Sequence, residues 1–399
     1  MKIDDKTSHN SPSLRFPEFT GEWEKCKLGT LATKVGSGST PKGGDAVYTS
    51  IGHYFVRSQN VGMGFLMLDN IAHINDDIHQ KHKATEIYEN DVLLNITGAS
   101  IGRTAVATKE LEGGNVNQHV CIIRTNSKVN PKFLCDYIQT QRIQNHIKSL
   151  QTGGSREGLN FEQIRSFPIS LPSINEQNKL TCLLDKINER IATQVRLIED
   201  LKKLSCAIVE KMFKQSKTNG RLGDFIEQVS VRNKNGLYSN VLSVSNKQGF
   251  VKQSEQFEDR TVASEDTSNY KIVKRNNFAY NPARINVGSI ARLTKFDVGI
   301  VSPMYVCFRT KDGIIPEYME AFFTSQQFFY EMMKRLEGSV RLCLSYEGLC
   351  NIPVYIPNMN KQIVMGQNIS LILSKIGLEI EYLGRLHQQK QYLLRKMFI

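Results

Sequence analysis

The sequence predicts two similar mixed α/β domains, each followed by one long helix, with the two helices packed against each other. Three observations support this fold class. One long stretch carries apolar residues in a heptad series, the same series recurs 185 residues later (365 − 180), and segments before it recur at nearly the same offset. Solenoid repeats have far shorter periods, so the chain is a tandem duplication of whole domain-plus-helix units.

The first long stretch, residues 174–213, lacks proline and glycine, and its apolar residues alternate in steps of four and three. This spacing is the seam of a helix that packs against another helix. At about 1.5 Å per residue, forty residues make a rod of roughly 60 Å, which needs a partner helix. The predicted seam residues are Leu180, Leu184, Ile187, Ile191, Ile198, Leu201 and Ile208.

The second copy keeps the seam apolar. Adding 185 to each number gives Met365, Ile369, Ile372, Ile376, Leu383, Leu386 and Leu393. The polar interruptions also match, Gln194 with Glu379 and Ser205 with Lys390. Whether these four residues pair with one another stays open, and they are candidates for fixing the helix register.

The first unit begins after a polar tail, residues 1–13, which we expect to be disordered. Its domain spans 14–171 and its long helix 172–217. Within the domain, 27–35 predicts a short helix, 54–75 short strands, 91–96 a buried strand and 119–125 the next strand. Pro131 opens a helix that we expect to run to about Leu150.

The second unit repeats this plan, with a domain over 218–356 and a long helix over 357–399. Residues 221–229 predict a helix, 242–250 match 57–65, and 275–293 match the first unit's buried strand and following turn. Residues 301–310 predict a strand, and Pro316 opens a helix through Leu336.

Composition narrows the function classes. A net charge of +12 with a pI near 9.2 suits a polyanionic partner, although charge alone does not decide this. The N-terminus lacks an apolar signal region and no apolar run reaches about 18 residues, so we expect a cytoplasmic protein. The eight cysteines form no CxxC pair, and we expect mostly buried free thiols.

Enzyme motifs are missing. The chain has no GxxxxGK[ST] loop, no HExxH and no GxSxG, and its histidines, such as His53 and His79, are scattered in polar surroundings, where we expect them to be solvated. Residues 281–284 (Asn-Pro-Ala-Arg) approach the Asn-Pro-Pro-aromatic signature of amino-methyltransferases but lack the second proline and the aromatic residue. We interpret them as the end of a buried strand. The sequence predicts neither a catalytic residue nor a metal site.

Loops that recur in both units carry the chemistry of nucleic-acid contacts. Glycines let backbone amides approach phosphate, hydroxyls bind phosphate oxygens, arginine grips phosphate or guanine, and Asn or Gln can read adenine. A turn with a solvated charge is the alternative for any one residue. The candidates are Ser37, Ser39, Thr40, Lys42, Arg57, Gln59, Asn60, Thr97, Ser100, Arg103, Ser155 and Arg156 in the first unit, and Ser245, Asn246, Lys247, Arg284, Asn286, Ser289, Arg292, Ser339 and Arg341 in the second.

Four segments resemble the specificity (S) subunits of type I restriction–modification systems, and the resemblance covers nearly the whole chain. They are GSGSTPKGG (36–44), NDVLLNITGASIGRTAV (90–106), NPARINVGSIA (281–291) and FPISLPSINEQNKLTCLLDKI (167–187). The second helix head departs from this pattern, with Lys361 where the first has Glu176.

The resemblance implies two target-recognition domains held by an antiparallel coiled coil, each reading half of a split, asymmetric double-stranded DNA target. It also implies two methyltransferase subunits that use S-adenosylmethionine, and restriction subunits that use ATP and Mg, while this chain holds no cofactor and performs no catalysis. The outward residues Leu197, Leu204, Leu371 and Leu378 either face such partners or pack onto their own domains. The alternatives are a single-chain methyltransferase or restriction enzyme, and a coiled-coil scaffold without a nucleic-acid role.

Overall fold

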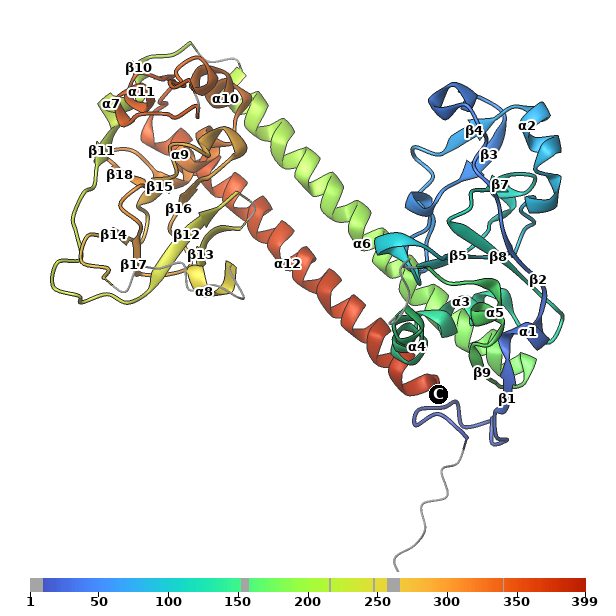
Figure 1. Ribbon diagram of the computed structural model, residues 1–399. Helices are drawn as coiled ribbons and strands as arrows, with labels where there is room; N and C mark the ends of the chain where they lie inside the picture. Colours follow the sequence, from blue (N-terminus) through green and yellow to red (C-terminus); the bar gives the residue numbers. More distant parts are fainter. Residues whose placement is uncertain (1–9, 152–157, 215–216, 247, 257–265, 340) are drawn as a thin grey trace, which may run out of the picture. The chain divides into compact units, whose positions relative to one another are not determined.

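The computed structural model describes residues 10–151, 158–214, 217–246, 248–256, 266–339 and 341–399. The chain divides into two compact units, unit 1 with Met1–Thr193 and Leu383–Ile399 and unit 2 with Gln194–Tyr382 (Figure 1). Residues 1–9 of the expected tail lie outside the described residues. Residues 10–13 do not behave as a free tail, because Ser13 Oγ donates to Lys396 O at 3.3 Å and Trp23 N to Asn10 O at 2.9 Å.

Unit 1 opens with a strand, a one-turn helix and a second strand, and its first segment continues into the first half of a long helix. Its strands are β1 (Glu24–Lys27), β2 (Ala32–Ser37), β3 (His53–Val56), β4 (Ala72–Ile74), β5 (Val92–Asn95), β6 (Thr104–Val106), β7 (Asn115–Val116), β8 (Val120–Thr125) and β9 (Pro168–Leu171). Its helices are α1 (Leu28–Leu31), α2 (Asp76–Lys81), α3 (Pro131–Gln139), α4 (Gln141–Gln151) and α5 (Phe161–Arg165).

Two sheets form the body of unit 1. The antiparallel sheet has the order β2-β8-β5-β6, and the smaller sheet has the order β4-β3-β7 with β3 and β7 parallel. Successive side chains of a strand point to opposite faces. Leu94 therefore joins the core under α3, whereas Leu93 joins the core towards the smaller sheet. Burial on both faces explains the continuous apolar run of β5.

Unit 2 has the same organisation. Its strands are β10 (Gly220–Arg221), β11 (Ile226–Gln228), β12 (Val241–Ser245), β13 (Gly249–Lys252), β14 (Lys271–Lys274), β15 (Phe278–Tyr280), β16 (Ile290–Arg292), β17 (Val298–Val301), β18 (Val306–Thr310) and β19 (Pro353–Val354). Its helices are α7 (Leu222–Phe225), α8 (Gln253–Gln256), α9 (Pro316–Phe323), α10 (Gln326–Met333) and α11 (Tyr346–Cys350).

The sheets of unit 2 correspond to those of unit 1 strand by strand. The order β11-β18-β15-β16 repeats β2-β8-β5-β6, and β13-β12-β17 repeats β4-β3-β7 with the same parallel pair in the same place. Unit 2 adds β14 at the edge next to β17. Phe278 and Ala279 face opposite cores, as Leu94 and Leu93 do.

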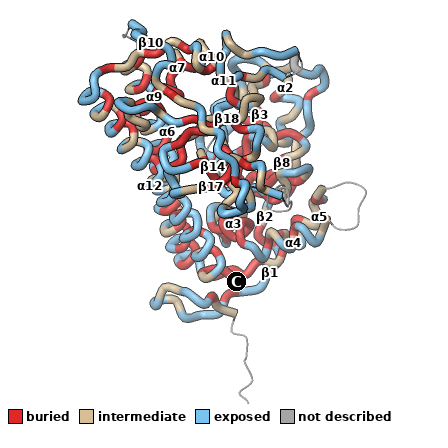
Figure 2. Tube along the Cα trace, turned by 90° about the vertical axis from the view of Figure 1, so that its left-hand side faces the viewer, coloured by how far each residue is buried: buried red, intermediate tan, exposed pale blue. Residues whose placement is uncertain are grey.

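The two long helices are α6 (Ile174–Lys214) and α12 (Met359–Met397). All predicted seam residues are buried or half-buried, and buried positions recur between exposed ones along α12 (Figure 2). Each helix is divided between the units. Gln194 donates to Glu379 O at 3.1 Å within unit 2, which answers the open question for this pair. Pairing of the helices over their whole length stays a prediction.

A buried glutamine fixes the head of each long helix. Gln177 accepts from Asn130 N at 2.8 Å and donates to the carbonyls of Lys128 and Pro172 at 3.1 and 2.9 Å. Gln362 makes the same three bonds, with Ile315 N, Gly313 O and Pro357 O. Each partner differs in number by 185 (315 − 130, 313 − 128, 357 − 172), so the duplication extends to single hydrogen bonds.

Several predicted helices are shorter than expected. The helix from Pro131 ends at Gln139, because Thr140 has an extended backbone (φ −62°, ψ 146°) before α4 begins. The helix from Pro316 likewise ends at Phe323, and Ser325 caps a new one by accepting from Phe328 N. The two segments predicted as opening helices each form a one-turn helix, α1 and α7, and then continue into the strands β2 and β11.

Candidate nucleic-acid interface

In unit 1, the candidate loops meet at one end of the antiparallel sheet. The turn after β5 is joined to the loop before α5 by a bond from Leu159 N to Ile96 O at 2.8 Å. Asn95, buried at the end of β5, donates to Ser58 O at 2.8 Å and to Ser100 Oγ at 3.2 Å. One amide thus holds the 57–60 loop against the turn after β5.

Unit 2 brings its equivalent loops together with the same backbone contact. Leu344 N donates to Pro282 O at 3.1 Å, the counterpart of the Leu159–Ile96 bond. Ser289 Oγ donates to Val244 O at 3.1 Å and joins the turn after β15 to the end of β12. A hollow of about 390 Å³ lies beside these loops and is lined by Pro282, Val306, Glu337, Gly338, Arg341, Cys343, Leu344 and Ser345.

Glycine shapes the turn after the central strand in both units. Gly102 has φ +86° and Gly288 has φ +87°, a left-handed conformation that costs other residues energy. A Cβ on Gly102 would also lie 2.8 Å from Gln144 Oε1. Each turn carries an exposed arginine, Arg103 in unit 1 and Arg284 in unit 2. Guanidinium groups at these positions can reach phosphate or guanine.

Most of the candidate residues lie at the surface of these loop clusters. The exposed ones are Ser39, Thr40, Lys42, Gln59, Arg103, Asn246, Arg284, Ser339 and Arg341, and the half-buried ones are Ser37, Arg57, Thr97, Ser100, Ser245 and Asn286. Arg57 lies over the Tyr48 ring, with its guanidinium carbon 5.4 Å from the ring centre. Ser155, Arg156 and Lys247 lie outside the described residues.

Three candidates do not reach the surface, and for them the structure corrects the sequence interpretation. Asn60 is 3 % exposed and bonded to Arg57 N and Met67 O. Ser289 is 4 % exposed, and its hydroxyl donates a hydrogen bond to Val244 O. Arg292 is 8 % exposed, donates to Asn276 and Glu320 at 2.9 Å each, and is ion-paired with Glu317. These side chains support loops and offer nothing to DNA.

Sequence reasoning missed the turn between β7 and β8. Gln118 is exposed and His119 half-buried, and both lie between the 37–42 loop and the turn after β5. Gly38 N donates to Asn117 O at 3.1 Å, and Ile96 N to His119 O at 3.0 Å. The sequence placed His119 at the start of a strand. The signal available was its neighbour Asn117, a residue that favours turns.

The residues that approached a catalytic pattern have local structural roles. Asn281 Oδ1 accepts from Ala283 N at 3.1 Å, so this side chain caps its own turn, as the interpretation of a strand end requires. Not all histidines are solvated: His79 is 2 % exposed and stacks on His53 with ring centres 3.8 Å apart. Among the described residues, no three His, Cys, Asp or Glu side chains form a group suited to a metal ion.

The cysteines are all free, and their environments differ. Burial raises the pKa of Cys121, Cys135 and Cys307 to about 12, which keeps these thiols protonated and unreactive. Cys182 and Cys206 are exposed on α6, contrary to the expectation of mostly buried thiols for these two.

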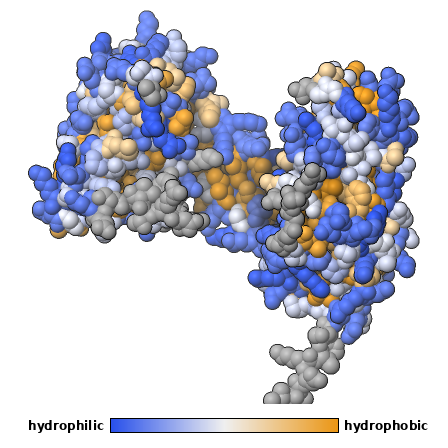
Figure 3. All heavy atoms as spheres, viewed as in Figure 1, coloured by the Kyte–Doolittle hydropathy of each residue, from blue (hydrophilic) through white to orange (hydrophobic). Residues whose placement is uncertain are grey.

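The long helices expose apolar side chains away from the seam. Leu197 and Leu204 on α6 are 40 % and 49 % exposed, and Leu371 and Leu378 on α12 are 68 % and 63 % exposed. Figure 3 shows apolar atoms on the visible surface of these helices. By length and composition alone, α12 is the one helix among the described residues that could cross a membrane, which is weak support for a span.

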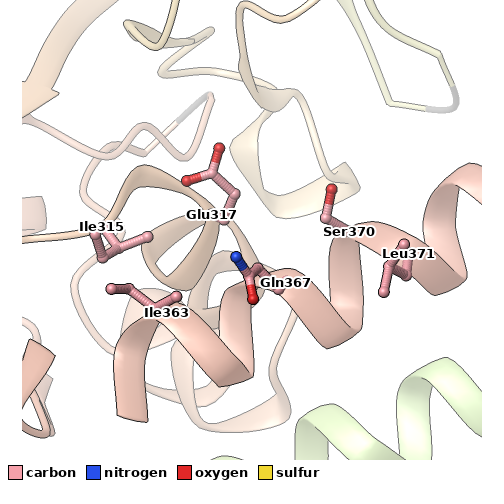
Figure 4. Close-up of a pocket in the computed structure, with 6 residues that line it drawn as sticks. All are labelled: Ile315, Glu317, Ile363, Gln367, Ser370 and Leu371. Atoms are coloured by element: carbon pink, nitrogen blue, oxygen red, sulfur yellow. The ribbon is translucent and has the colours of Figure 1, made fainter. Parts of the chain in front are cut away.

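A hollow of about 650 Å³ lies on this face of unit 2, between the start of α9 and α12. Figure 4 shows Ile363, Gln367, Ser370 and Leu371 along α12, with Ile315 and Glu317 opposite them. An exposed apolar surface of this kind is typical of a protein-binding face.

Comparisons with known proteins match this architecture. Residues 20–203 match the family described as "Type I restriction modification DNA specificity domain". The specificity subunit of the type I restriction enzyme EcoBI from Escherichia coli is 24% identical over 135 residues, 33% of this chain and 28% of that protein. The MjaX specificity subunit ascribed to Methanocaldococcus jannaschii is 20% identical over 208 residues, 51% of this chain and 48% of that protein. The matches therefore span at most about half of these relatives.

Two solved structures share the fold. The S subunit of a type I restriction–modification system from M. genitalium has a TM-score of 0.62 and 17% identity, with 98% of this chain and 99% of that chain covered. A chain from a study of complex assembly and conformational transition of the type I R-M system has a TM-score of 0.55 and 14% identity, with 94% and 97% covered. Residues 20–203 are thus similar to the type I restriction–modification DNA specificity domain, and the chain has the fold of type I specificity subunits over nearly its whole length.

Proposed function

We propose that this chain is the DNA-reading subunit of a cytoplasmic type I restriction–modification complex and reads a split, asymmetric target with its two units. One observation carries the proposal: each unit gathers equivalent loops at one end of its sheet, with an exposed arginine on a glycine turn. The net charge of +12 favours DNA as the ligand. Two similar but not identical loop clusters suit two different half-sites.

The chain acts in this proposal as a scaffold without catalytic residues of its own. Methyltransferase subunits, which bring S-adenosylmethionine, dock on the exposed apolar faces of α6 and α12, and restriction subunits bring ATP and Mg. The long helices pair antiparallel over their whole length and set the unread spacer. The exposed leucines and the hollow between α9 and α12 support docking, and the Gln194–Glu379 contact supports pairing.

Methylation mapping tests the proposal as a whole. Genomic DNA is sequenced by a single-molecule method that detects modified adenine, from cells that hold the methyltransferase subunit with and without this chain. A split motif of modified adenines that appears only with the chain is the expected result. Modification without the chain, or only a short continuous motif, contradicts the proposal. Binding of S-adenosylmethionine to the isolated chain would favour the alternative, a single-chain methyltransferase.

The two exposed arginines provide a local test. Arg103→Ala and Arg284→Ala should each weaken binding of the chain–methyltransferase complex to its target by about 5- to 100-fold at fixed salt, the range for loss of one strong base contact. Fluorescence anisotropy with target and scrambled duplexes measures this. Arg196→Ala removes the same charge from an exposed position on α6 and is the matched control. If all three variants bound the target DNA with equal affinity, these two turns would not be part of the DNA interface.

A further inference from the structure

The turn of residues 117–119 between β7 and β8 is held rigidly in the loop cluster of unit 1. Asn117 N donates to Val56 O at 3.0 Å, and Asn117 Oδ1 accepts from His119 N at 3.0 Å. The flanking loops hold the turn through Gly38 and Ile96. A preorganised side chain at this position loses little conformational freedom on binding.

A line of hydrogen-bonded side chains crosses this turn. Thr40 Oγ1 donates to Gln118 Oε1, Gln118 Nε2 lies 3.1 Å from His119 Nε2, and His119 Nδ1 bonds Thr97 Oγ1. The amide nitrogen can only donate, so His119 Nε2 accepts and Nδ1 carries the ring proton. In this arrangement the oxygen end of the Gln118 amide faces Thr40 and the nitrogen end faces His119.

The number of donors and acceptors on an amide shows which hydrogen-bonding positions of Gln118 remain for a ligand. An amide oxygen has two lone pairs and an amide nitrogen has two hydrogens, and each end uses one of them within this line. One acceptor position and one donor position of the amide remain on this exposed side chain. Adenine presents N6–H as donor and N7 as acceptor in the major groove, and glutamine pairs with both.

We propose that Gln118 reads an adenine in the half-site of unit 1, with Thr40, His119 and Thr97 as positioning residues that orient its amide. This inference rests on the proposed function. It applies to one half of the target only, because the positions 185 residues later are Pro303 and Met304. Proline has no side-chain hydrogen-bonding group, and Met304, 61 % exposed, is apolar.

Methylation mapping with Gln118→Met tests the assignment in cells. This change keeps the length of the side chain and removes its donor and acceptor. One A·T position in one half-site should become degenerate, while the other half-site and the spacer stay as in the wild type. Gln388→Met, an exposed glutamine on α12, is the control and should leave the whole motif unchanged. A motif unchanged by Gln118→Met overturns the inference.

Base analogues test the contact without relying on a variant that could fold poorly. Duplexes carrying 7-deazaadenine, which lacks the N7 acceptor, at each adenine of the half-site are titrated with the wild-type chain–methyltransferase complex. One position should bind about 5- to 20-fold more weakly, since one of two base contacts is lost. In Gln118→Met the same substitution should have no effect. The absence of any sensitive adenine in the wild type contradicts the inference.

The positioning residues have their own signature. Thr40→Val removes the hydroxyl that orients the amide and should relax the same base position, whereas Thr40→Ser should restore it. A purely structural role would lower affinity for all duplexes alike. If the wild type yields no split motif at all, the proposed function fails. If the split motif is present but Gln118→Met leaves it intact, only this inference fails.

Discussion

At the scale of single residues, the duplication is clearest in the glutamines at the two helix heads. Gln177 is fully buried and Gln362 is 2 % exposed, and each bonds one backbone N–H and two backbone carbonyls. The sequence showed that the two residues are equivalent. It could not show their role, because two of the three partners of each glutamine lie 47 and 49 residues away in the chain.

Gln177→Leu or Gln362→Leu should therefore destabilise the unit that holds it. Three backbone groups lose their partners, and the bond to the proline carbonyl is buried while the other two are part-buried. An unsatisfied buried group costs about 1–3 kcal/mol, so we expect a loss of about that size. Urea unfolding followed by circular dichroism gives the change. Gln367→Leu, exposed on α12, is the matched control and should change stability by less than about 0.5 kcal/mol. Small effects for all three would mean that the helix heads are held by other contacts.

The candidate site shows where sequence reasoning succeeds and where it stops. Arg103, Arg284 and Arg292 each lie in or beside the turn after a central strand and looked alike as candidates. Only Arg292 is buried, because its guanidinium forms ion pairs with Glu317 and Glu320 on α9. Its placement depends on residues 25 to 28 positions away, which no local pattern reveals.

At the scale of elements, periodicity predicted the long helices well and the shorter ones less well. The apolar seams of α6 and α12 could be predicted from the sequence because one face of each helix is buried along its whole length. The helix breaks at Thr140 and Thr324 could not be predicted from the sequence, because threonine is not a strong helix breaker. In the structure, the hydroxyl groups of these threonines donate to the carbonyls of Tyr137 and Ala321.

The contact between α3 and α12 makes the stability of unit 1 depend on pH. Burial raises the pKa of Asp136 to about 7, with Lys390 lowering it, Asp185 raising it and Lys132 lowering it. Lys390, buried itself, donates to Gln139 at 3.1 Å beside this carboxyl. A folded-state pKa above the unfolded value means that the folded state binds more protons between about pH 4 and pH 7, so stability falls as pH rises through that range.

Asp136→Asn should remove this dependence. Relative to the variant, the wild type should lose about 2–4 kcal/mol between pH 4 and pH 7, and the difference should level off above pH 7. Thermal unfolding of both proteins across this range measures it. The difference curve isolates Asp136 from the other carboxylates. A flat difference curve would show that Asp136 is ionised in the folded protein throughout.

At the scale of the whole chain, each unit is completed by a helix end that lies far away in the sequence. Phe398 stacks on Phe133 in unit 1 at 5.4 Å between ring centres, and Tyr137 donates to Ile399 O. Its counterpart Phe213 (398 − 185) packs on Tyr318 and Phe322 in unit 2 at 5.5 and 5.2 Å. The last residues of the chain thus belong to the core of the first unit, and the end of the first helix belongs to the second.

Matched substitutions test this exchange of ends. Phe398→Ala should destabilise unit 1 and Phe213→Ala should destabilise unit 2, each by about 3–5 kcal/mol. Hydrogen exchange with mass spectrometry distinguishes the units: α3 should lose protection only in Phe398→Ala, and α9 only in Phe213→Ala. Loss of protection in both helices for either variant would indicate that the units unfold together.

The same arrangement sets an order of events during synthesis on the ribosome. Unit 2, Gln194–Tyr382, is one continuous segment and can complete its core as soon as it has emerged. Unit 1 appears first but lacks Leu394, Met397 and Phe398 until these residues have been synthesised. Domains usually mature from the N-terminus onwards. Here the segment made first finishes folding last, and its open core needs protection while all of unit 2 is synthesised.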